Sequence, residues 1–537
     1  MSALDARERS ALLRRLADER FDLLVVGGGI TGAGIARDAA LRGLTVALLE
    51  AEDFAAGTSN RSTKLIHGGL RYLAMGDFRL VREAALERKA VHAMAPHLAE
   101  PRWMVLPVRS RMEALKYWVG VTVYERLGDV APEDVHGRWD EATLAREEPL
   151  LDRKRFPSAC VYREYLTDDA RLVLATLRAA AGAGAAVASR MRVEGFLFAR
   201  ERICGARARC GLTDEIIEVR ARHVVNAAGP WAERVASMEA ATEGASRLHL
   251  SKGVHIVLPR AVLPIENLLF LPMPDSRFIF AIPRGEVVYL GTTDTTYVGE
   301  RHLWPEVEAT DVDYLLEPVS RCFRADRPSP DDVVAAWAGL RPLIAQTGKA
   351  AKEMSRKDEI WIGRGGMLTI AGGKLTGFRH MAEDVLSTLE RASGERLPPP
   401  PGPTTLPGGD FEGGISELVA GLPGVGNLGE ACAARLARLY GSEAGGVLER
   451  GAEPLVPGGV VLSGEVDWAI KEEAAQTLED FVYRRTRAAW YAPAEREDIL
   501  APAAERMAVM LGWDDAERAR QLAAARERLR DEFAFRA

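Results

Sequence analysis

Cysteine is scarce in this chain, and no two cysteines form a CxxC pair. The 537 residues include five: Cys160, Cys204, Cys210, Cys322 and Cys432. An odd number of scattered cysteines argues against a disulfide framework and a cysteine zinc site, and it indicates a reducing compartment. The histidines show no metal-ligand spacing either, so we expect no metal site.

The chain also lacks an excess of positive charge, a long apolar run and an apolar leader. Its formal net charge of -7 argues against a broad nucleic-acid-binding face, although it leaves room for a local basic patch on a membrane surface. No apolar stretch reaches the length of a membrane span, and the segment 1–20 is charged and helical in pattern. We therefore expect a globular protein of two or three domains that is soluble or peripheral to a membrane.

The most informative motif begins at Asp22. A short apolar run leads into a glycine-rich turn, Gly27-x-Gly29-x-x-Gly32, which is followed by a helix-like segment and a second apolar run. Strand, turn, helix and strand in this order are the layout of a dinucleotide-binding βαβ unit. The glycines permit a tight turn and close approach of a diphosphate, and the helix N-terminus attracts the phosphates.

The second apolar run ends on Glu50, where such units carry an acidic residue. Its carboxylate would accept hydrogen bonds from a ribose hydroxyl and would repel a 2′-phosphate, so we expect an adenosine without that phosphate. A purely structural glycine turn is the alternative. The strand, helix, second strand and acid together favour a bound dinucleotide.

The pattern of the remaining chain predicts an interleaved domain organisation. Helical patterns and strand-like pieces alternate up to about residue 230, and a β-rich region runs from Lys252 to Leu290. A strand from Met367 then passes through a glycine-rich turn into a helix. We expect a dinucleotide-binding domain in three pieces (1–95, about 165–245 and about 345–395), an inserted second domain (about 96–164 and 246–344), a proline-rich linker (397–409) and a helical C-terminal domain (410–537).

Five motifs together resemble one enzyme family, the FAD-dependent (aerobic, respiratory) glycerol-3-phosphate dehydrogenases. They are GGGITGAGIARDAALRG, TKLIHGGLRYL, NAAGPW, LGTTD with AGLRPL, and AGGKLTGFR. The resemblance runs from about Asp22 to Arg379 and, more loosely, from Asp480 to Tyr491. It implies an α/β fold: a Rossmann-like FAD-binding domain with an inserted antiparallel β substrate domain, and a C-terminal all-α domain.

The resemblance also implies an activity. Such an enzyme oxidises sn-glycerol 3-phosphate to dihydroxyacetone phosphate by hydride transfer from C2 to N5 of FAD, and membrane quinone reoxidises the cofactor. We therefore expect a peripheral protein of the cytoplasmic face of the cell membrane, or a cytoplasmic one. The sequence leaves open whether the chain works as a monomer or as a homodimer.

A small phosphorylated substrate requires cationic side chains, preferably arginines, whose planar fork matches phosphate oxygens. The family motifs place His255 beside the substrate as a base, with Arg341 and Arg71 as its catalytic partners, although a histidine in an apolar strand is by itself more often a core residue. Arg356 matches the family only loosely. The expected substrate contacts are Arg71, Tyr72, His255, Thr293, Arg341, Arg356 and Lys374.

Two further segments are expected to contact FAD. The polar segment GTSNRSTKLIHGG would hold the diphosphate and ribityl chain, and the turn at Gly373 would direct a helix N-terminus at the flavin, with a plain strand–helix turn as the alternative. The expected cofactor contacts are Gly27, Gly28, Gly29, Ile30, Thr31, Gly32, Glu50, Thr58, Ser59, Ser62, Thr63, Lys64, Leu65, His67, Gly68, Gly69, Ala228, Gly229, Gly373, Lys374, Leu375 and Thr376.

Three questions remain open from the sequence. The segment 111–127 is apolar or aromatic on nearly every helical face, which fits a membrane-contacting helix almost as well as an internal packing helix. The electron acceptor is either quinone or, in a glycerol-3-phosphate oxidase, O2; oxidases of the family tend to carry a mid-chain insert that is not evident here. The last alternative is an FAD-binding sensor without activity.

Overall fold

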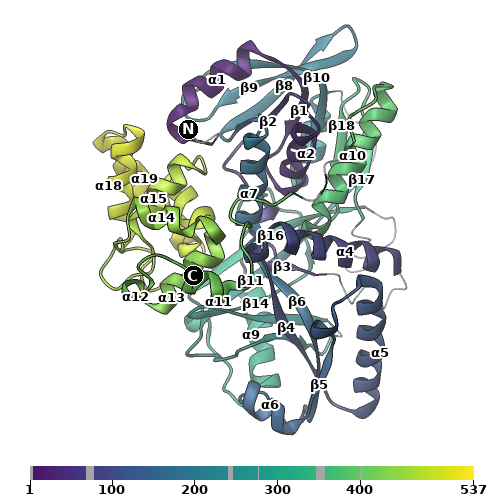
Figure 1. Ribbon diagram of the computed structural model, residues 1–537, viewed down its shortest axis with the longest axis vertical. Coiled ribbons are helices and arrows are strands. Elements are labelled where there is room, and N and C mark those ends of the chain that lie inside the picture. Colours follow the sequence, from purple (N-terminus) through teal and green to yellow (C-terminus); the bar gives the residue numbers. More distant parts are fainter. Residues whose placement is uncertain are drawn as a thin grey trace.

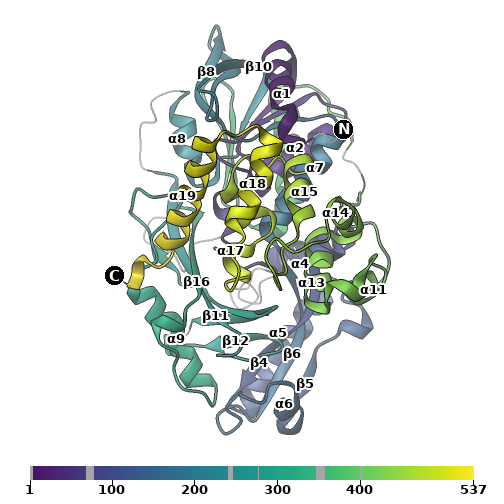
Figure 2. The same ribbon diagram turned by 90° about the vertical axis from the view of Figure 1, so that its left-hand side faces the viewer.

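The computed structural model describes residues 4–67, 78–239, 246–275, 277–345, 357–399, 402 and 404–536, without the side chains of Leu80, Glu133 and Asn427. Two β-sheets lie one above the other, and the C-terminal helices cover one side of both (Figures 1 and 2). The expected α/β fold with a second β domain and a C-terminal helical domain is thereby confirmed.

The first sheet has the strand order β17-β18-β10-β1-β2-β7, in which the pairs from β18 to β7 are parallel and β17 is antiparallel to β18. Strand β1 pairs in parallel with β10 and with β2, and the apolar residues Leu23 and Leu24 at its centre are buried. Helix α2 packs against both α7 and α10 beside this sheet. The elements are α1 (Arg9–Asp18), β1 (Arg20–Val26), α2 (Ile30–Leu41), β2 (Val46–Leu49), α7 (Asp169–Gly182), β7 (Ala186–Ala188), β8 (Met191–Ala199), β9 (Arg202–Cys210), β10 (Ile216–Asn226), α8 (Ala232–Ser237), β17 (Glu359–Ile362), β18 (Leu368–Ala371) and α10 (Phe378–Ser393).

Strand β10 is one continuous strand, although the sequence pattern predicts two separate strands there, at 216–219 and 223–228. Its first half pairs antiparallel with β9 and alternates exposed and buried residues, with Arg220 on the exposed side. Its second half joins β1 in the parallel sheet and is buried. The charged residues on the exposed face interrupt the apolar run, which is why the pattern suggested two strands.

The second sheet combines two separate parts of the chain, in the order β15-β11-β14-β13-β12-β4-β6-β3, with β16 on β11 and β5 on β6. Its pairs are antiparallel except β12 with β4, which are parallel because no hairpin connects these two parts. The elements are β3 (Leu65–Ile66), α4 (Phe78–Met94), β4 (Ala99–Val108), α5 (Arg111–Gly128), β5 (Gly137–Trp139), α6 (Glu141–Glu147), β6 (Ser158–Thr167), β11 (Leu248–Pro259), β12 (Leu268–Pro272), β13 (Phe278–Arg284), β14 (Val287–Gly291), β15 (Thr295–Thr296), α9 (Ala309–Cys322) and β16 (Ala335–Ile344).

The secondary structure of the described C-terminal region consists mainly of helices joined by loops. Its elements are α11 (Ile415–Ala420), α12 (Val425–Leu428), α13 (Glu430–Tyr440), α14 (Ala444–Arg450), α15 (Ser463–Lys471), α16 (Leu478–Asp480), the π-helix η10 (Phe481–Arg485), α17 (Ala488–Tyr491), α18 (Leu500–Leu511) and α19 (Asp515–Asp531). All five cysteines are free thiols. Among the described helices, none is both long and apolar enough to cross a bilayer.

Candidate functional site

A cavity of about 720 Å³ lies where the carboxyl ends of the first sheet face strand β16 of the second. The residues that follow β1, β2, β10 and β18 all line it. Ligands of open α/β sheets bind at this edge of the strands. The cavity is therefore where a dinucleotide is expected.

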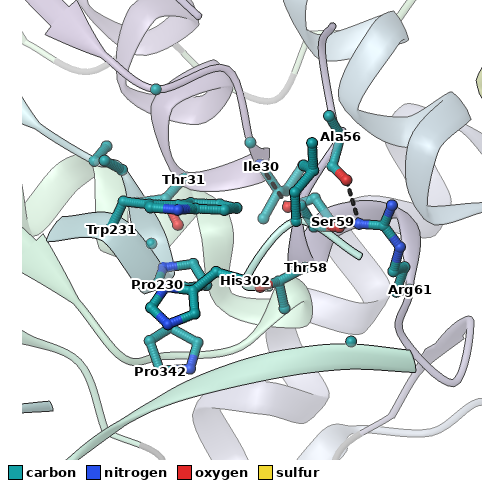
Figure 3. A pocket seen from close by; sticks show the side chains of 18 of the residues that line it. Ile30, Thr31, Ala56, Thr58, Ser59, Arg61, Pro230, Trp231, His302 and Pro342 are labelled. Atoms are coloured by element: carbon teal, nitrogen blue, oxygen red, sulfur yellow. Dashed lines mark hydrogen bonds between the residues drawn. The ribbon is translucent and has the colours of Figure 1, made fainter. Parts of the chain in front are cut away.

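The glycine-rich turn between β1 and α2 forms one wall of this cavity. Gly27 has a positive φ of 114°, and a Cβ there would lie 2.6 Å from the carbonyl oxygen of Ala227 on the neighbouring strand. A Cβ on Gly32 would overlap the carbonyl oxygen of Gly27. The hydroxyl of Ser59 accepts the N–H of Ile30 at 3.0 Å, while the next N–H groups of the first turn of α2 remain available to a phosphate (Figure 3).

Glu50 lies in the cavity wall directly after β2. One carboxylate oxygen accepts the N–H of Gly28 at 2.6 Å, and the other accepts the N–H of Glu52 at 2.8 Å. Burial raises the pKa of Glu50, against the effect of these two hydrogen bonds. The backbone thus fixes the carboxylate at the edge where a ribose hydroxyl would bind.

The polar loop Gly57–Lys64, which we call the cofactor loop, is fixed at both ends. The Thr58 hydroxyl donates to the carbonyl of Leu340 on β16 at 2.6 Å. Asp169 at the start of α7 accepts the N–H and the hydroxyl of Ser62 at 3.0 and 2.8 Å. Lys64 is fully buried and binds the same carboxylate at 3.0 Å. It does not line the cavity, so its expected contact with the diphosphate is replaced by an ion pair behind the loop.

Arg487 of the C-terminal domain supports this loop from the other side. Its guanidinium is 1% exposed and donates to Asp168 at 3.1 Å and to Asp169 at 3.0 Å. It also donates to the side-chain oxygen of Asn60 within the loop. A residue of the last domain therefore fixes both the loop and the acid that anchors it.

His255 on β11 is buried directly behind the cofactor loop. Its Nε2 lies 3.1 Å from the hydroxyl of Thr63, and its ring stacks on Trp337 at 5.0 Å. Burial, together with the charges of Lys64 and Arg341, holds the pKa of His255 well below its usual value, so the ring is neutral.

Arg341 on β16 lies at the edge of the cavity nearest His255. Its Nη2 donates to the hydroxyl of Thr292 at 2.9 Å, its Nη1 donates to the carbonyl of Thr293 at 3.3 Å, and Asp294 lies 3.6 Å away. Lys374 lines the same cavity from the turn after β18. Two cations thus line the same cavity as the helix N-terminus of α2.

The structure brings most of the predicted site residues into one cavity. Those in its lining are Gly27, Gly29, Ile30, Thr31, Glu50, Thr58, Ser59, Ser62, Thr63, Leu65, His67, Ala228, Gly229, Arg341, Gly373, Lys374, Leu375 and Thr376. Gly28, Gly32, Lys64, His255 and Thr293 lie behind the lining. Gly68, Gly69, Arg71, Tyr72 and Arg356 fall outside the described residues.

The sequence did not single out several residues that line the cavity. Trp231 lies across it above Pro230 and His302, and Arg61 points away from them toward Ala56 (Figure 3). Trp304 and, from helix α19, Arg528 complete the wall. Trp231 belongs to the NAAGPW motif that was read for its glycine, whereas nothing in the pattern around Trp304 or Arg528 connects them to the site.

The lining fits the predicted dinucleotide. A glycine turn that has no room for side chains, a helix N-terminus and an acid fixed by backbone N–H groups are the three elements that hold an adenosine diphosphate. The same cavity also has the cationic and hydroxyl groups that a phosphorylated alcohol requires.

Comparisons with known proteins agree with this reading. The sequence model of a family described as FAD dependent oxidoreductase matches residues 22–379, and that of the C-terminal domain of alpha-glycerophosphate oxidase matches residues 403–518. An aerobic glycerol-3-phosphate dehydrogenase of Staphylococcus aureus (strain USA300) is 36% identical over 539 residues, which are 96% of this chain and 95% of the relative. One from Staphylococcus haemolyticus (strain JCSC1435) is 40% identical over 393 residues, or 72% and 70% of the two chains. A structure of glycerol-3-phosphate dehydrogenase from Bacillus halodurans complexed with FAD is 31% identical, with a TM-score of 0.81 and 99% of each chain covered.

Proposed function

Because this chain belongs to the aerobic glycerol-3-phosphate dehydrogenases, which are FAD-dependent oxidoreductases, we propose that it oxidises sn-glycerol 3-phosphate to dihydroxyacetone phosphate. FAD supplies the redox chemistry by accepting the C2 hydride at N5, and membrane quinone then takes the electrons. The observation that carries the proposal is that Arg341 and Lys374 share one cavity with the glycine turn of α2.

The two cations would bind the phosphate of the substrate. Arg341 is oriented by the threonine pair at 292–293 and keeps 20% of its side chain exposed toward the cavity. A guanidinium held in this way offers a planar pair of donors to phosphate oxygens. Arg71, Tyr72 and Arg356 are proposed to complete the substrate site.

His255 is proposed to take the proton of the C2 hydroxyl. Its neutral ring can accept a proton, although burial above all, and then the neighbouring cations Lys64 and Arg341, lower its pKa and make it a weak base in the absence of ligand. A bound phosphate dianion would offset the charges of the two cations and so raise the pKa of His255 from this lowered value. Thr63 holds Nε2, and Nδ1 has no hydrogen-bond partner in the described part of the chain.

Anaerobic reduction tests this function directly. Glycerol 3-phosphate added to the purified holoenzyme should bleach the flavin absorbance, whereas glycerol, which lacks the phosphate, should not. Arg341→Lys is the matched variant, because it keeps the charge but loses the fork, and it should need a higher concentration of substrate. A flavin that stays oxidised with glycerol 3-phosphate would refute the proposal.

Quinone as the acceptor requires contact with a membrane, and helix α5 is proposed to supply it. Met112, Leu115 and Val119 are 78%, 59% and 53% exposed and follow one face of the helix, while Lys116 and Arg126 are exposed beside them. The helix lies along the outer edge of the second sheet, away from the C-terminal helices (Figure 1).

Tyr124 belongs to the same helix, and its amphipathic ring would suit a bilayer surface by sequence. In the structure it does not face outward, because it is buried and accepts a hydrogen bond from Arg88 at 2.7 Å.

Vesicle binding tests this contact. The double variant Leu115→Glu with Val119→Glu should lose co-sedimentation with anionic lipid vesicles and keep its activity with a soluble dye. Val509→Glu is the control, because Val509 is an 87% exposed helix residue of the C-terminal domain. Unchanged sedimentation of the double variant would exclude α5 as the membrane contact.

Molecular oxygen is the second candidate acceptor. The match of residues 403–518 to a domain described from alpha-glycerophosphate oxidase favours testing it. Stoichiometric hydrogen peroxide in air, with no rate increase on adding a quinone, would assign the oxidase reaction instead.

A further inference from the structure

Arg61 in the cofactor loop is a buried cation without an acidic partner. Its side chain is in the cavity wall and the residue is 3% exposed. Nη1 donates to the carbonyl of Ala56 and, at 3.3 Å, to that of Gly57. Nε and Nη2 are buried without a hydrogen-bond partner. Across the described ranges, no carboxylate lies within ion-pair distance of this guanidinium.

Burial and two neighbouring guanidinium groups disfavour the charge of Arg61, whereas an indole face stabilises it. Trp304 lies 3.9 Å from the guanidinium, and the guanidinium of Arg528 lies 4.3 Å from the same ring. Burial, with the like charges of Arg484 and Arg528 and against the opposite charge of Glu479, lowers the pKa of Arg61 to about 9. Arg484 is equally buried, but it binds Asp53 and Asp480.

The position of Arg61 indicates which anion is missing. It lies two residues after Ser59, whose hydroxyl holds the first turn of α2 at the glycine-rich motif. This turn is where a helix N-terminus and backbone N–H groups receive a diphosphate. An uncompensated positive charge next to that place is costly until a negative group arrives.

We propose that Arg61 is the buried counter-charge for the diphosphate of FAD. The inference rests on FAD as the cofactor and assigns to Arg61 a positioning role that acts through charge, because its Nε and Nη2 atoms are buried and not exposed to the cavity. In the low-dielectric interior of a protein, a charge acts on a group that it does not touch far more strongly than it would in water. The phosphate of the substrate is the second phosphate anion proposed for this cavity. The experiment distinguishes it from the diphosphate of FAD.

The direct measurement is the rate of FAD release from the holoenzyme. It is monitored by the recovery of flavin fluorescence after dilution. Arg61→Gln removes the charge and keeps an N–H donor for the carbonyl of Ala56, so release should be at least about 10-fold faster, equivalent to about 1.4 kcal/mol. Arg61→Lys keeps the charge and should stay close to wild type. Arg61→Met is a second neutral variant that needs no polar partner, and it should behave like the glutamine variant.

Arg37 provides a matched control. It is also buried, at 6% exposed, burial lowers its pKa to about 10, and it donates to the carbonyl of Thr404 at 3.1 Å. It does not line the cavity. Arg37→Gln should therefore release FAD within about twofold of wild type, well short of the tenfold step that 1.4 kcal/mol represents.

Three outcomes would overturn the proposal. They are wild-type release from both neutral variants, equal acceleration in Arg61→Gln and Arg37→Gln, or equal acceleration in the lysine and glutamine variants. The proposal would also fail if the neutral variants released FAD at the wild-type rate but needed a higher concentration of glycerol 3-phosphate for half-bleaching of the flavin. That result would assign the charge of Arg61 to substrate binding. Release is measured without substrate, so failure of the dehydrogenase reaction itself leaves this test intact.

Discussion

Replacing Arg487 by methionine tests whether the C-terminal domain holds the cofactor loop. The guanidinium is 1% exposed and binds Asp168, Asp169 and Asn60 together. Removing one member of a buried ionic cluster costs about 3–5 kcal/mol when its partners are left unpaired.

The expected cost for Arg487→Met lies at the lower end of that range. Asp168 keeps Arg284 at 2.6 Å, and Asp169 keeps Lys64 at 3.0 Å, so neither carboxylate becomes an isolated charge. We expect a loss of about 3 kcal/mol, which is a fall in melting temperature of roughly 3 °C for a chain of 537 residues. Release of FAD should accelerate as well, because Asn60 and the anchor of Ser62 loosen together.

Thermal melting of the holoenzyme and FAD release are the two assays. Arg518→Met is the control, because Arg518 pairs with Asp515 on the surface of α19, where the two side chains are 40% and 95% exposed. Such a pair contributes at most about 1 kcal/mol. Equal melting and equal FAD release in the two variants would refute the reasoning.

Three further predictions concern other parts of the molecule. Arg341→Ala should lower kcat/KM for glycerol 3-phosphate in a dye-linked assay by at least about 100-fold, because hydrogen bonds from a cation to a phosphate contribute about 3 kcal/mol; unchanged kinetics would remove Arg341 from the substrate site. Gly32→Ala should abolish FAD retention, since a Cβ there overlaps the carbonyl of Gly27, whereas Gly182→Ala at the end of α7, with nothing within 4 Å of its Cβ, should keep the yellow colour of the protein. Burial raises the pKa of Glu532, which accepts the indole N–H of Trp490 at 2.8 Å, from 4.5 to about 7. The folded state therefore holds this proton more tightly than the unfolded state, and the associated stability, up to about 3 kcal/mol, is present below pH 4.5 and is lost as the pH rises through 7. Glu532→Gln should melt higher than wild type at pH 8 and equally at pH 5, and an equal difference at both pH values would contradict this assignment.

The parts of the site that were predictable are those made by local sequence. The glycine turn, Glu50 and the turn at Gly373 each follow a strand directly, and parallel strands place their carboxyl ends at one edge. Arg341 was predicted from its motif and lies in the cavity. The relatives confirm the family that these motifs resemble.

The parts that escaped prediction depend on contacts between distant segments. Lys64 belongs to the specific motif TKLIHGGLRYL, yet its ammonium turns behind the loop because Asp169 is buried there. Arg61 and Trp304 meet across more than two hundred residues of chain, and no periodicity encodes such a contact. The local sequence of a polar loop predicts that a basic residue in it is exposed, because only tertiary packing shows that the residue is buried.

The support of the cofactor loop by Arg487 has a consequence for biosynthesis. The loop is among the first segments to leave the ribosome, and its partner is made more than four hundred residues later. A nascent chain that ends at the linker after α10 carries the complete glycine-rich turn but not the cation that fixes Asn60 and Asp169. FAD should therefore be retained only after the last domain has emerged and docked, and chains shortened at the linker should accumulate as colourless protein.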